Sequence, residues 1–152
     1  MSIWEDLLRK LGIGDDFANR SPLRVFLLDD DTLRHEWFTK RFAADQLDIA
    51  VEPQHAIELL AGNSYDAIFL DHDLLPEHYD TLNSRDDERT GYAIASWLAA
   101  RPALQAGATI LVHTRNANGA LRMVEAMRRA GRAAEYVPFP HLGHKIKSYW
   151  KR

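Results

Sequence analysis

The sequence of 152 residues predicts an α/β fold, a single domain with one doubly wound, five-stranded parallel sheet. The first observation behind this prediction is that five short apolar runs alternate with segments whose apolar residues recur at helical spacing. The second is that length and composition, with 46% hydrophobic and 27% charged residues, are those of one globular domain. Strands alternating with helices favour parallel pairing and right-handed crossovers, with helices on both faces.

Residues 1–20 are predicted to form an amphipathic helix and a linker ahead of the main α/β domain, residues 21–152. Apolar residues recur there at helical spacing before a Gly-Ile-Gly-Asp-Asp stop, namely Ile3, Trp4, Leu7, Leu8 and Leu11. Such a stripe is more often ordinary core, and the alternative is a docking surface. With the cluster of Ile146, Tyr149 and Trp150 at the other end, it would make a homodimer through the terminal helices.

The first half of the main domain contains three predicted strands and two predicted helices. The opening run after Pro22 is continuously apolar, as in a strand buried on both faces. Asp31 or Thr32 can cap the helix that follows, and Pro53 suits the first turn of the next one. In order, the elements are a strand over 23–28, a helix from 32, a strand over 48–52, a helix over 53–62 and a strand over 66–70.

The second half repeats this alternation after a long polar segment, residues 75–89. That segment exceeds the roughly two to six residues usual between a strand and a helix, so we expect either an acidic mobile loop or one that closes over a ligand. The remaining elements are a helix from Thr90, a strand over 109–113, a helix over 117–130, a strand over 134–138 and a final helix over 141–150.

Polar side chains follow the predicted strands where they end, and the carboxyl ends of parallel strands share one edge of the sheet, where ligands bind. Crowded carboxylates repel each other unless a cation joins them, and hard oxygen ligands suit Mg²⁺ or Mn²⁺. We therefore predict a divalent metal site formed by Asp29, Asp30, Asp71 and Asp73. The alternative, that residues 29–31 are only helix caps, does not explain Asp71 and Asp73.

Proton-transfer and phosphate-binding groups are predicted at the same edge. His72 and His113 can carry protons at neutral pH, and together with Asp71 they are our candidate catalytic residues. Taken alone, His72 would be read as a buried imidazole bonded to a backbone carbonyl. Small polar and cationic groups can bind phosphate oxygens, and the candidates for substrate binding are Thr114, Asn116, Thr90 and Arg89.

The composition argues against several other classes of protein. The chain has no cysteine, so disulfides and thiolate sites are excluded, and no apolar run approaches the roughly 20 residues of a membrane span. We expect a cytoplasmic protein without a membrane partner. A net charge of -3 gives no general attraction to duplex nucleic acid, and we expect no such partner. Duplex binding would have to use Arg122, Arg128, Arg129, Arg132, Lys145, Lys147, Lys151 and Arg152.

Over residues 23–150 the layout resembles the response-regulator receiver domain, which implies a receiver (flavodoxin-like) architecture. The resemblance is carried by LLDDD (Leu27–Asp31), FLDHD (Phe69–Asp73), VHT (Val112–Thr114) and YVPFP (Tyr136–Pro140). Phe139 stands where a signalling receiver has the lysine that contacts the phosphoryl group. The resemblance therefore does not transfer the aspartyl-phosphate switch, and a phospho-accepting or non-catalytic interaction module stays as the alternative.

The sequence is more similar to an atypical branch, the cyclic-phosphate-processing receiver family. The matching motifs are LLDDD, LDHDL (Leu70–Leu74), TGY (Thr90–Tyr92) and HTRNANG (His113–Gly119). This resemblance implies metal-assisted processing of a cyclic phosphate on a nucleotide or an RNA end. Our hypothesis is that a divalent ion activates a water that attacks phosphorus, while His113 or His72 protonates the leaving ribose oxygen.

Overall fold

The computed structural model describes residue 3, residues 21–74 and residues 88–150. Within these residues five strands form one sheet in the order β2-β1-β3-β4-β5, and every neighbouring pair is parallel. The predicted α/β fold is confirmed. The predicted N-terminal helix, apart from Ile3, and the loop over 75–87 lie outside the described residues.

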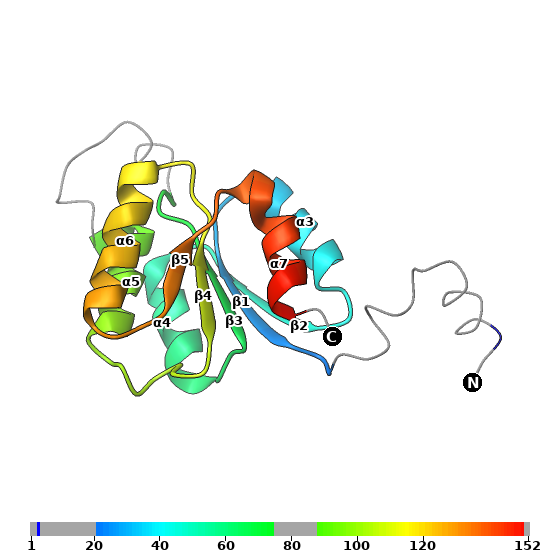
Figure 1. Cartoon of the computed structure of the whole chain (residues 1–152), viewed down its shortest axis with the longest axis horizontal. Helices are drawn as coiled ribbons and strands as arrows, with labels where there is room; N and C mark the ends of the chain where they lie inside the picture. The colour runs from blue at the N-terminus through cyan, green and yellow to red at the C-terminus, as the bar shows by residue number, and fades with distance from the viewer. Residues whose placement is uncertain (1–2, 4–20, 75–87, 151–152) are drawn as a thin grey trace.

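The elements follow the predicted alternation (Figure 1). The strands are β1 (Arg24–Leu28), β2 (Gln46–Ala50), β3 (Ala67–Leu70), β4 (Thr109–Val112) and β5 (Ala134–Tyr136). The helices are α3 (Thr32–Arg41), α4 (Pro53–Gly62), α5 (Gly91–Ala99), α6 (Ala117–Arg129) and α7 (Leu142–Trp150), with a 3-10 turn, η3 (Phe139–His141), before α7.

Several element boundaries differ by one or two residues from those expected from the sequence, and two of the differences have a clear local cause. The second strand ends at Ala50, two residues before the expected end, because Glu52 caps α4 by accepting a hydrogen bond from the His55 amide at 2.9 Å. His141 lies in η3 instead of the final helix. Pro140 lies inside that turn and removes a backbone donor, which favours a short tight turn before α7 begins.

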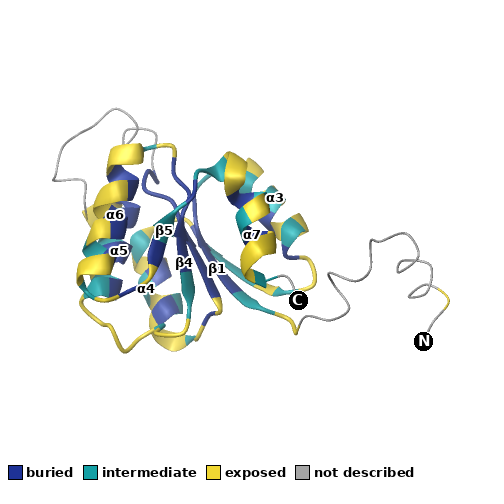
Figure 2. Ribbon diagram, viewed as in Figure 1, coloured by how far each residue is buried: buried dark blue, intermediate teal, exposed yellow. Residues whose placement is uncertain are grey.

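The sheet lies between two helical layers, with α3 and α7 on one face and α4, α5 and α6 on the other (Figure 1). Side chains along β1 alternate between the two cores: Phe26 and Leu28 pack toward α4 to α6, while Val25 and Leu27 pack toward α3 and α7. The central strands are therefore buried on both faces (Figure 2), which explains their continuous apolar sequence.

The order of the strands places the functional residues. The chain moves from β1 to the edge strand β2, then crosses back to β3 on the other side of β1, so the direction of winding reverses beside β1. Leu28 of β1 pairs with Leu70 of β3 in the register, so the residues that follow these two strands emerge side by side. Such a reversal is where open α/β sheets bind ligands.

Candidate functional site

Three carboxylates gather where β1 and β3 end. Asp29, Asp30 and Asp71 each place an oxygen so that all three oxygens lie within 4.8 Å of one another. Asp29 is fully buried and Asp71 is 2% exposed. Their backbone amides extend the sheet pairing beyond the strand ends, because the Asp29 amide donates to the Ala50 carbonyl at 3.1 Å and the Asp71 amide donates to the Leu28 carbonyl at 2.9 Å. The sheet itself therefore fixes both residues.

Arg34 supplies a positive charge to this cluster, and sequence reasoning missed it. Its Nε lies 2.7 Å from Asp29 Oδ2, and its Nη2 lies 2.9 Å from Asp29 Oδ1 and 3.0 Å from Asp71 Oδ2. Arg34 sits in the first turn of α3, which Asp31 caps by accepting from the amides of Leu33 and Arg34. The cap holds the turn from which Arg34 bridges the two buried acids.

Burial and neighbouring charges shift the pKa values of the acids in opposite directions. Burial raises the pKa of Asp71 to about 6, against the attraction of His113 and Arg34. Burial would also raise the pKa of Asp29, but hydrogen bonds from His113 and Arg34 outweigh it and lower the value to about 2. Burial and the Asp29 charge raise the pKa of Asp30. The cluster therefore combines one firmly ionised acid with two that resist ionisation.

Each candidate histidine is paired with a carboxylate. The Nε2 of His113 lies 2.7 Å from Asp29 Oδ2, and the Nδ1 of His72 lies 2.7 Å from Asp73 Oδ1. The other ring nitrogens, His72 Nε2 and His113 Nδ1, are buried and have no hydrogen-bond partner in the described part of the chain. Buried polar atoms are seldom left without a partner, so each of these two ring nitrogens is a candidate for contact with a ligand.

Asp73, which we predicted as a metal ligand, belongs to a histidine pair in the structure. Its carboxylate lies against His72, and the structure does not bring it into the group formed by Asp29, Asp30 and Asp71. The side chain of His72 exposes only 9% of its surface and that of Asp73 only 3%. A carboxylate on Nδ1 orients the ring and selects its tautomer.

Two glycines make room for the polar residues after β3. A Cβ atom on Gly119 would lie 2.5 Å from His72 Cδ2, and one on Gly91 would lie 1.8 Å from the Asp71 carbonyl oxygen. The Gly91 amide also donates to the His72 carbonyl at 2.8 Å. Helices α5 and α6 can therefore dock their first turns against residues 71 and 72 only because these two positions lack a side chain.

The predicted phosphate-binding residues fall into two groups. Thr114 and Asn116 reach the site: Thr114 lowers the pKa of Asp71 against the larger effect of burial, and Asn116 Nδ2 lies 3.4 Å from Asp73 Oδ1. Asn116 also caps α6 by accepting from the Gly119 amide at 2.9 Å. Thr90 is buried and caps α5, its hydroxyl accepting from the Tyr92 amide at 3.3 Å. Its side chain holds a helix end next to the site.

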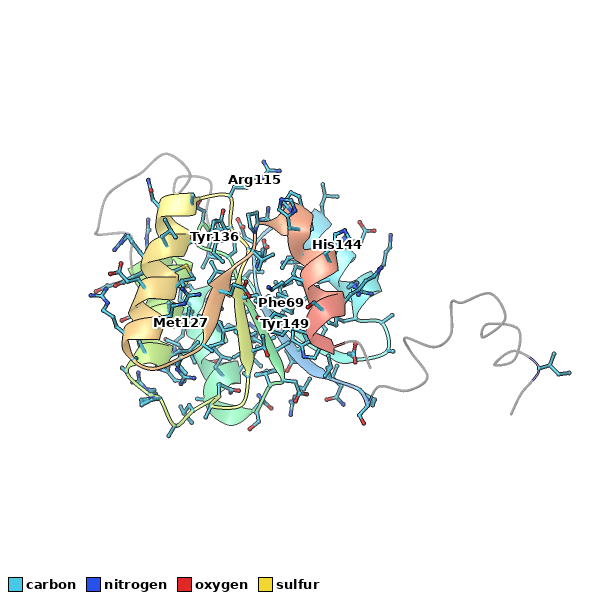
Figure 3. The ribbon with its side chains drawn as sticks, in the orientation of Figure 1. Phe69, Arg115, Met127, Tyr136, His144 and Tyr149 are labelled. Carbon is cyan, nitrogen blue, oxygen red and sulfur yellow. The ribbon has the colours of Figure 1, made fainter. Side chains whose placement is uncertain are left out.

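Arg89 lines a cavity of about 360 Å³ that none of the three clustered carboxylates lines. The cavity lies between the end of β2, the start of α4 and the approach to α5, and is lined by Val51, Glu52, Pro53, Gln54, Ile57, Leu74, Glu88, Arg89 and Ala93. Arg115 is exposed and points outward from the edge where β4 ends (Figure 3). Arg89, at the cavity beside α4, and Arg115, after β4, thus lie at different places on the surface.

The end of β5 presents aromatic surface. Phe139 packs with its ring centroid 5.0 Å from that of Trp37 and 6.5 Å from that of His113. The positive charge next to Asp71 is that of Arg34 in α3, whereas Phe139 packs its aromatic ring near that of His113.

Among the described residues no helix is both long enough and apolar enough to cross a membrane.

Comparison with solved structures shows the same fold in response-regulator receiver domains. A CheY-like receiver domain from Methanospirillum hungatei JF-1 superposes with a TM-score of 0.60 at 20% identity, covering 84% of this chain and 93% of that one. Response regulator TrrA from Thermotoga maritima, solved with Mg²⁺ and BeF, gives 0.58 at 19% identity, over 82% and 96%. A Burkholderia pseudomallei response regulator with a phosphorylated aspartic acid, calcium and citrate gives 0.56 at 20%, over 84% and 66%.

These structural likenesses establish the architecture, and sequence comparison is more specific. No curated protein matches the chain. Residues 23–129, well over half of the chain, match the sequence model of the cyclic-phosphate processing receiver domain. The match spans the strand ends that carry Asp29, Asp71 and His113, and it confirms the resemblance seen in the motifs. The chain belongs to the family of cyclic-phosphate processing receiver domains.

Proposed function

We propose that this domain hydrolyses a cyclic phosphate on a nucleotide or an RNA end, with the help of Mg²⁺ or Mn²⁺. The observation that carries the proposal is the pair of buried histidine–carboxylate contacts, His72 with Asp73 and His113 with Asp29, next to a cluster of three carboxylates. Proton transfer and charge neutralisation are what hydrolysis of a phosphoester requires. Membership of the family supports a cyclic phosphate as the substrate.

The chemistry of the acidic cluster fits a divalent cation. Asp29, Asp30 and Asp71 would hold it, since carboxylate oxygens are the ligands that Mg²⁺ and Mn²⁺ prefer. The Oδ1 atom of Asp30 is buried and lacks a hydrogen-bond partner in the described residues, as a ligand atom would. When bound, the ion would neutralise charge on the phosphate and act as a Lewis acid.

His72 is the group we assign to proton transfer. With Asp73 accepting from Nδ1–H, the Nε2 atom of the neutral ring is free to act as a base. It takes a proton from the attacking water as the new phosphorus–oxygen bond forms, and returns the proton to the ribose oxygen as the ring phosphorus–oxygen bond breaks. Water is thereby added across one ester bond, and the product is a phosphomonoester.

The remaining residues hold this arrangement in place. The Nε2 atom of His113 contacts Asp29 at 2.7 Å, so we assign His113 to holding that carboxylate. Thr114 and Asn116 lie next to Asp71 and Asp73 and are the candidates for contact with phosphate oxygens. Arg89 and Thr90, which directly precede α5, stay as predicted substrate contacts.

The test is turnover of a panel of 2′,3′-cyclic, 3′,5′-cyclic and cyclic-dinucleotide phosphates, with Mg²⁺, with Mn²⁺ or with a chelator. We expect metal-dependent opening of one substrate class, reduced at least about 100-fold by Asp71→Asn and by His72→Ala. Matched controls are Glu58→Gln and His144→Ala, two exposed residues outside the site, which should keep full activity.

Absence of turnover with every substrate, in a folded native protein, would contradict the proposal. It would favour the alternative, a receiver module that binds a partner or accepts a phosphoryl group on Asp71. Incubation with acetyl phosphate followed by mass spectrometry separates these two alternatives, because only the phospho-accepting module gains mass. The aromatic Phe139 at the end of β5 is the observation that weighs against phosphoryl transfer.

A further inference from the structure

We propose that Arg34 is a tethered cation that competes with the divalent ion for Asp29 and Asp71, so that the ion binds only when the guanidinium leaves. The inference rests on the proposed function in one respect, the assignment of the ion to these carboxylates. It goes further by naming the group that sets how tightly the ion is held.

The hydrogen bonds of Asp29 leave no direction open for a metal. Oδ1 accepts from the Asp31 amide at 2.8 Å and from Arg34 Nη2 at 2.9 Å. Oδ2 is contacted by Arg34 Nε and by His113 Nε2, both at 2.7 Å. Since each carboxylate oxygen has about two acceptor sites, Asp29 is saturated. An ion can coordinate Asp29 only if one of these partners moves.

Asp71 has a hydrogen-bond donor on each carboxylate oxygen. Its Oδ1 accepts from the backbone amide of His72 at 2.9 Å, and its Oδ2 accepts from Arg34 Nη2 at 3.0 Å. The same guanidinium nitrogen therefore bridges the two acids between which the ion would have to bind. Two cations that close to the same oxygens exclude each other through contact and through charge repulsion.

Among these partners Arg34 is the one that can leave. The other donors are backbone amides fixed by the chain and the fully buried ring of His113. The Arg34 side chain has several rotatable bonds and is 13% exposed, and its Nη1 already lies 3.5 Å from Oδ2 of Asp31, whose side chain is 37% exposed. Asp31 thus offers the guanidinium a second carboxylate on the solvent side. Asp30, with its unpartnered Oδ1, offers the ion a carboxylate oxygen that no donor of the described residues occupies.

The experiment compares Mn²⁺ binding by the native protein, Arg34→Gln and Arg41→Gln, using isothermal titration calorimetry in chelator-treated buffer. Arg41 lies in the last turn of the same helix, so its variant removes the same charge from the same element. We expect Arg34→Gln to bind Mn²⁺ at least about tenfold more tightly and Arg41→Gln to match the native protein. Equal or weaker binding by Arg34→Gln, or no binding by any of the three proteins, overturns the proposal.

Thermal melting provides a second readout in case the carboxylates destabilise Arg34→Gln. Without a counter-ion this variant should melt below the native protein in chelator, and Mn²⁺ should raise its melting temperature by more than it raises that of the native protein. An increase no larger than the native one contradicts competition. Should Arg34→Gln not fold, Arg34→Lys keeps the charge but loses the bidentate contact, and tighter Mn²⁺ binding is again expected. These measurements use no substrate, so their outcome does not depend on whether the domain hydrolyses a cyclic phosphate.

Discussion

Gly119 decides whether the His72 ring can lie between the end of β3 and the start of α6. In Gly119→Ala the new Cβ would fall 2.5 Å from a ring carbon of His72, so either the ring or the helix must move. We expect this substitution to lower the free energy of unfolding by about 1 to 3 kcal/mol. It should also reduce turnover, because the contact between His72 and Asp73 is disturbed. Urea unfolding and steady-state kinetics measure the two effects.

Gly143→Ala is the matched control for this substitution. Gly143 lies in α7, and a Cβ added there meets nothing within 4 Å. Alanine is the better helix former, so stability should be unchanged or should rise by up to about 1 kcal/mol. If Gly119→Ala and Gly143→Ala had the same free energy of unfolding and the same turnover, the space next to His72 would not require glycine at position 119.

Asp71 should make stability depend on pH in the direction opposite to most acids. Its pKa is raised by burial to about 6 from the ordinary 3.8, so the folded protein binds a proton more readily than the unfolded chain. Keeping Asp71 ionised in the folded protein lowers the free energy of unfolding, and this loss is present in full above pH 6, shrinks as the pH falls below 6, and is gone below 3.8. When the pH is lowered from 7 to 5, the free energy of unfolding of the native protein should therefore rise by about 1 kcal/mol relative to that of Asp71→Asn.

The measurement is urea unfolding of both proteins over this pH range in the presence of a chelator. The difference between them reports on Asp71 together with the charged groups that interact with it, because the rest of the chain is common to both. A difference that is independent of pH would show that Asp71 titrates near its ordinary value.

The sequence predicted the acids and histidines of the site but not the residues that hold them. Asp29 and Asp71 could be found because each directly ends an apolar run, and parallel strands end at a common edge. Arg34 could not, since its contact with Asp71 depends on how α3 is rotated against the sheet. The need for glycine at position 119 could not be predicted either, because it depends on the distance to a ring 47 positions away in sequence.

Among the helices and connections, the segment between α5 and β4 depends on one buried arginine. Arg132 is 8% exposed, and its guanidinium donates to the carbonyls of Leu98, Arg101, Leu104 and Gln105. Replacing it with leucine leaves these carbonyls without their donor in a partly buried position. We expect Arg132→Leu to lower the free energy of unfolding by about 3 kcal/mol or more, measured by urea denaturation.

Arg129 gives the comparison on the neighbouring helix α6. Its contact with Glu125 is 3.8 Å long and the Arg129 side chain is 70% exposed, so Arg129→Leu should change stability by less than about 0.5 kcal/mol. Comparable losses in the two variants would contradict the structural role of Arg132. The burial of Arg132 also means that it cannot serve the duplex-binding surface considered from sequence.

Element types were easier to predict than element ends. The strand predicted over 48–52 is a strand over Gln46–Ala50, because pairing with β1 and the Glu52 cap set its limits. Neither effect can be read from a short apolar run alone. The helices over 53–62 and 117–129 were well predicted because Pro53 and Asn116 mark their starts by local chemistry.

At the level of the whole domain, two apolar cores share one sheet. Trp37 and Trp150 pack with the core under α3 and α7, whereas Trp97 packs with the core under α4 to α6. Since the central strands contribute alternate residues to both, we expect the cores to unfold together. The test is urea unfolding of two variants that keep either Trp97 or Trp150 as the single tryptophan, with phenylalanine at the other positions.

Coinciding midpoints by fluorescence in both variants are the expected result, matched by far-UV circular dichroism. Two separate midpoints would show that one helical layer detaches before the sheet unfolds. The prediction of a single doubly wound sheet came from the same property, because continuous apolar runs indicate strands covered on both faces. What the sequence could not supply is how closely the helices approach the sheet at its functional edge.

The outer strand β5 limits how two copies of this domain can meet. It is only three residues long, its Ala134 carbonyl accepts from Arg128 at 2.9 Å, and Glu135 pairs with Lys145 at 2.9 Å. A short, charged edge is a poor template for a strand from another chain, so sheet extension and fibril formation are disfavoured on this side. Within the described residues, we therefore expect any self-association to use the helical surfaces or the edge formed by β2.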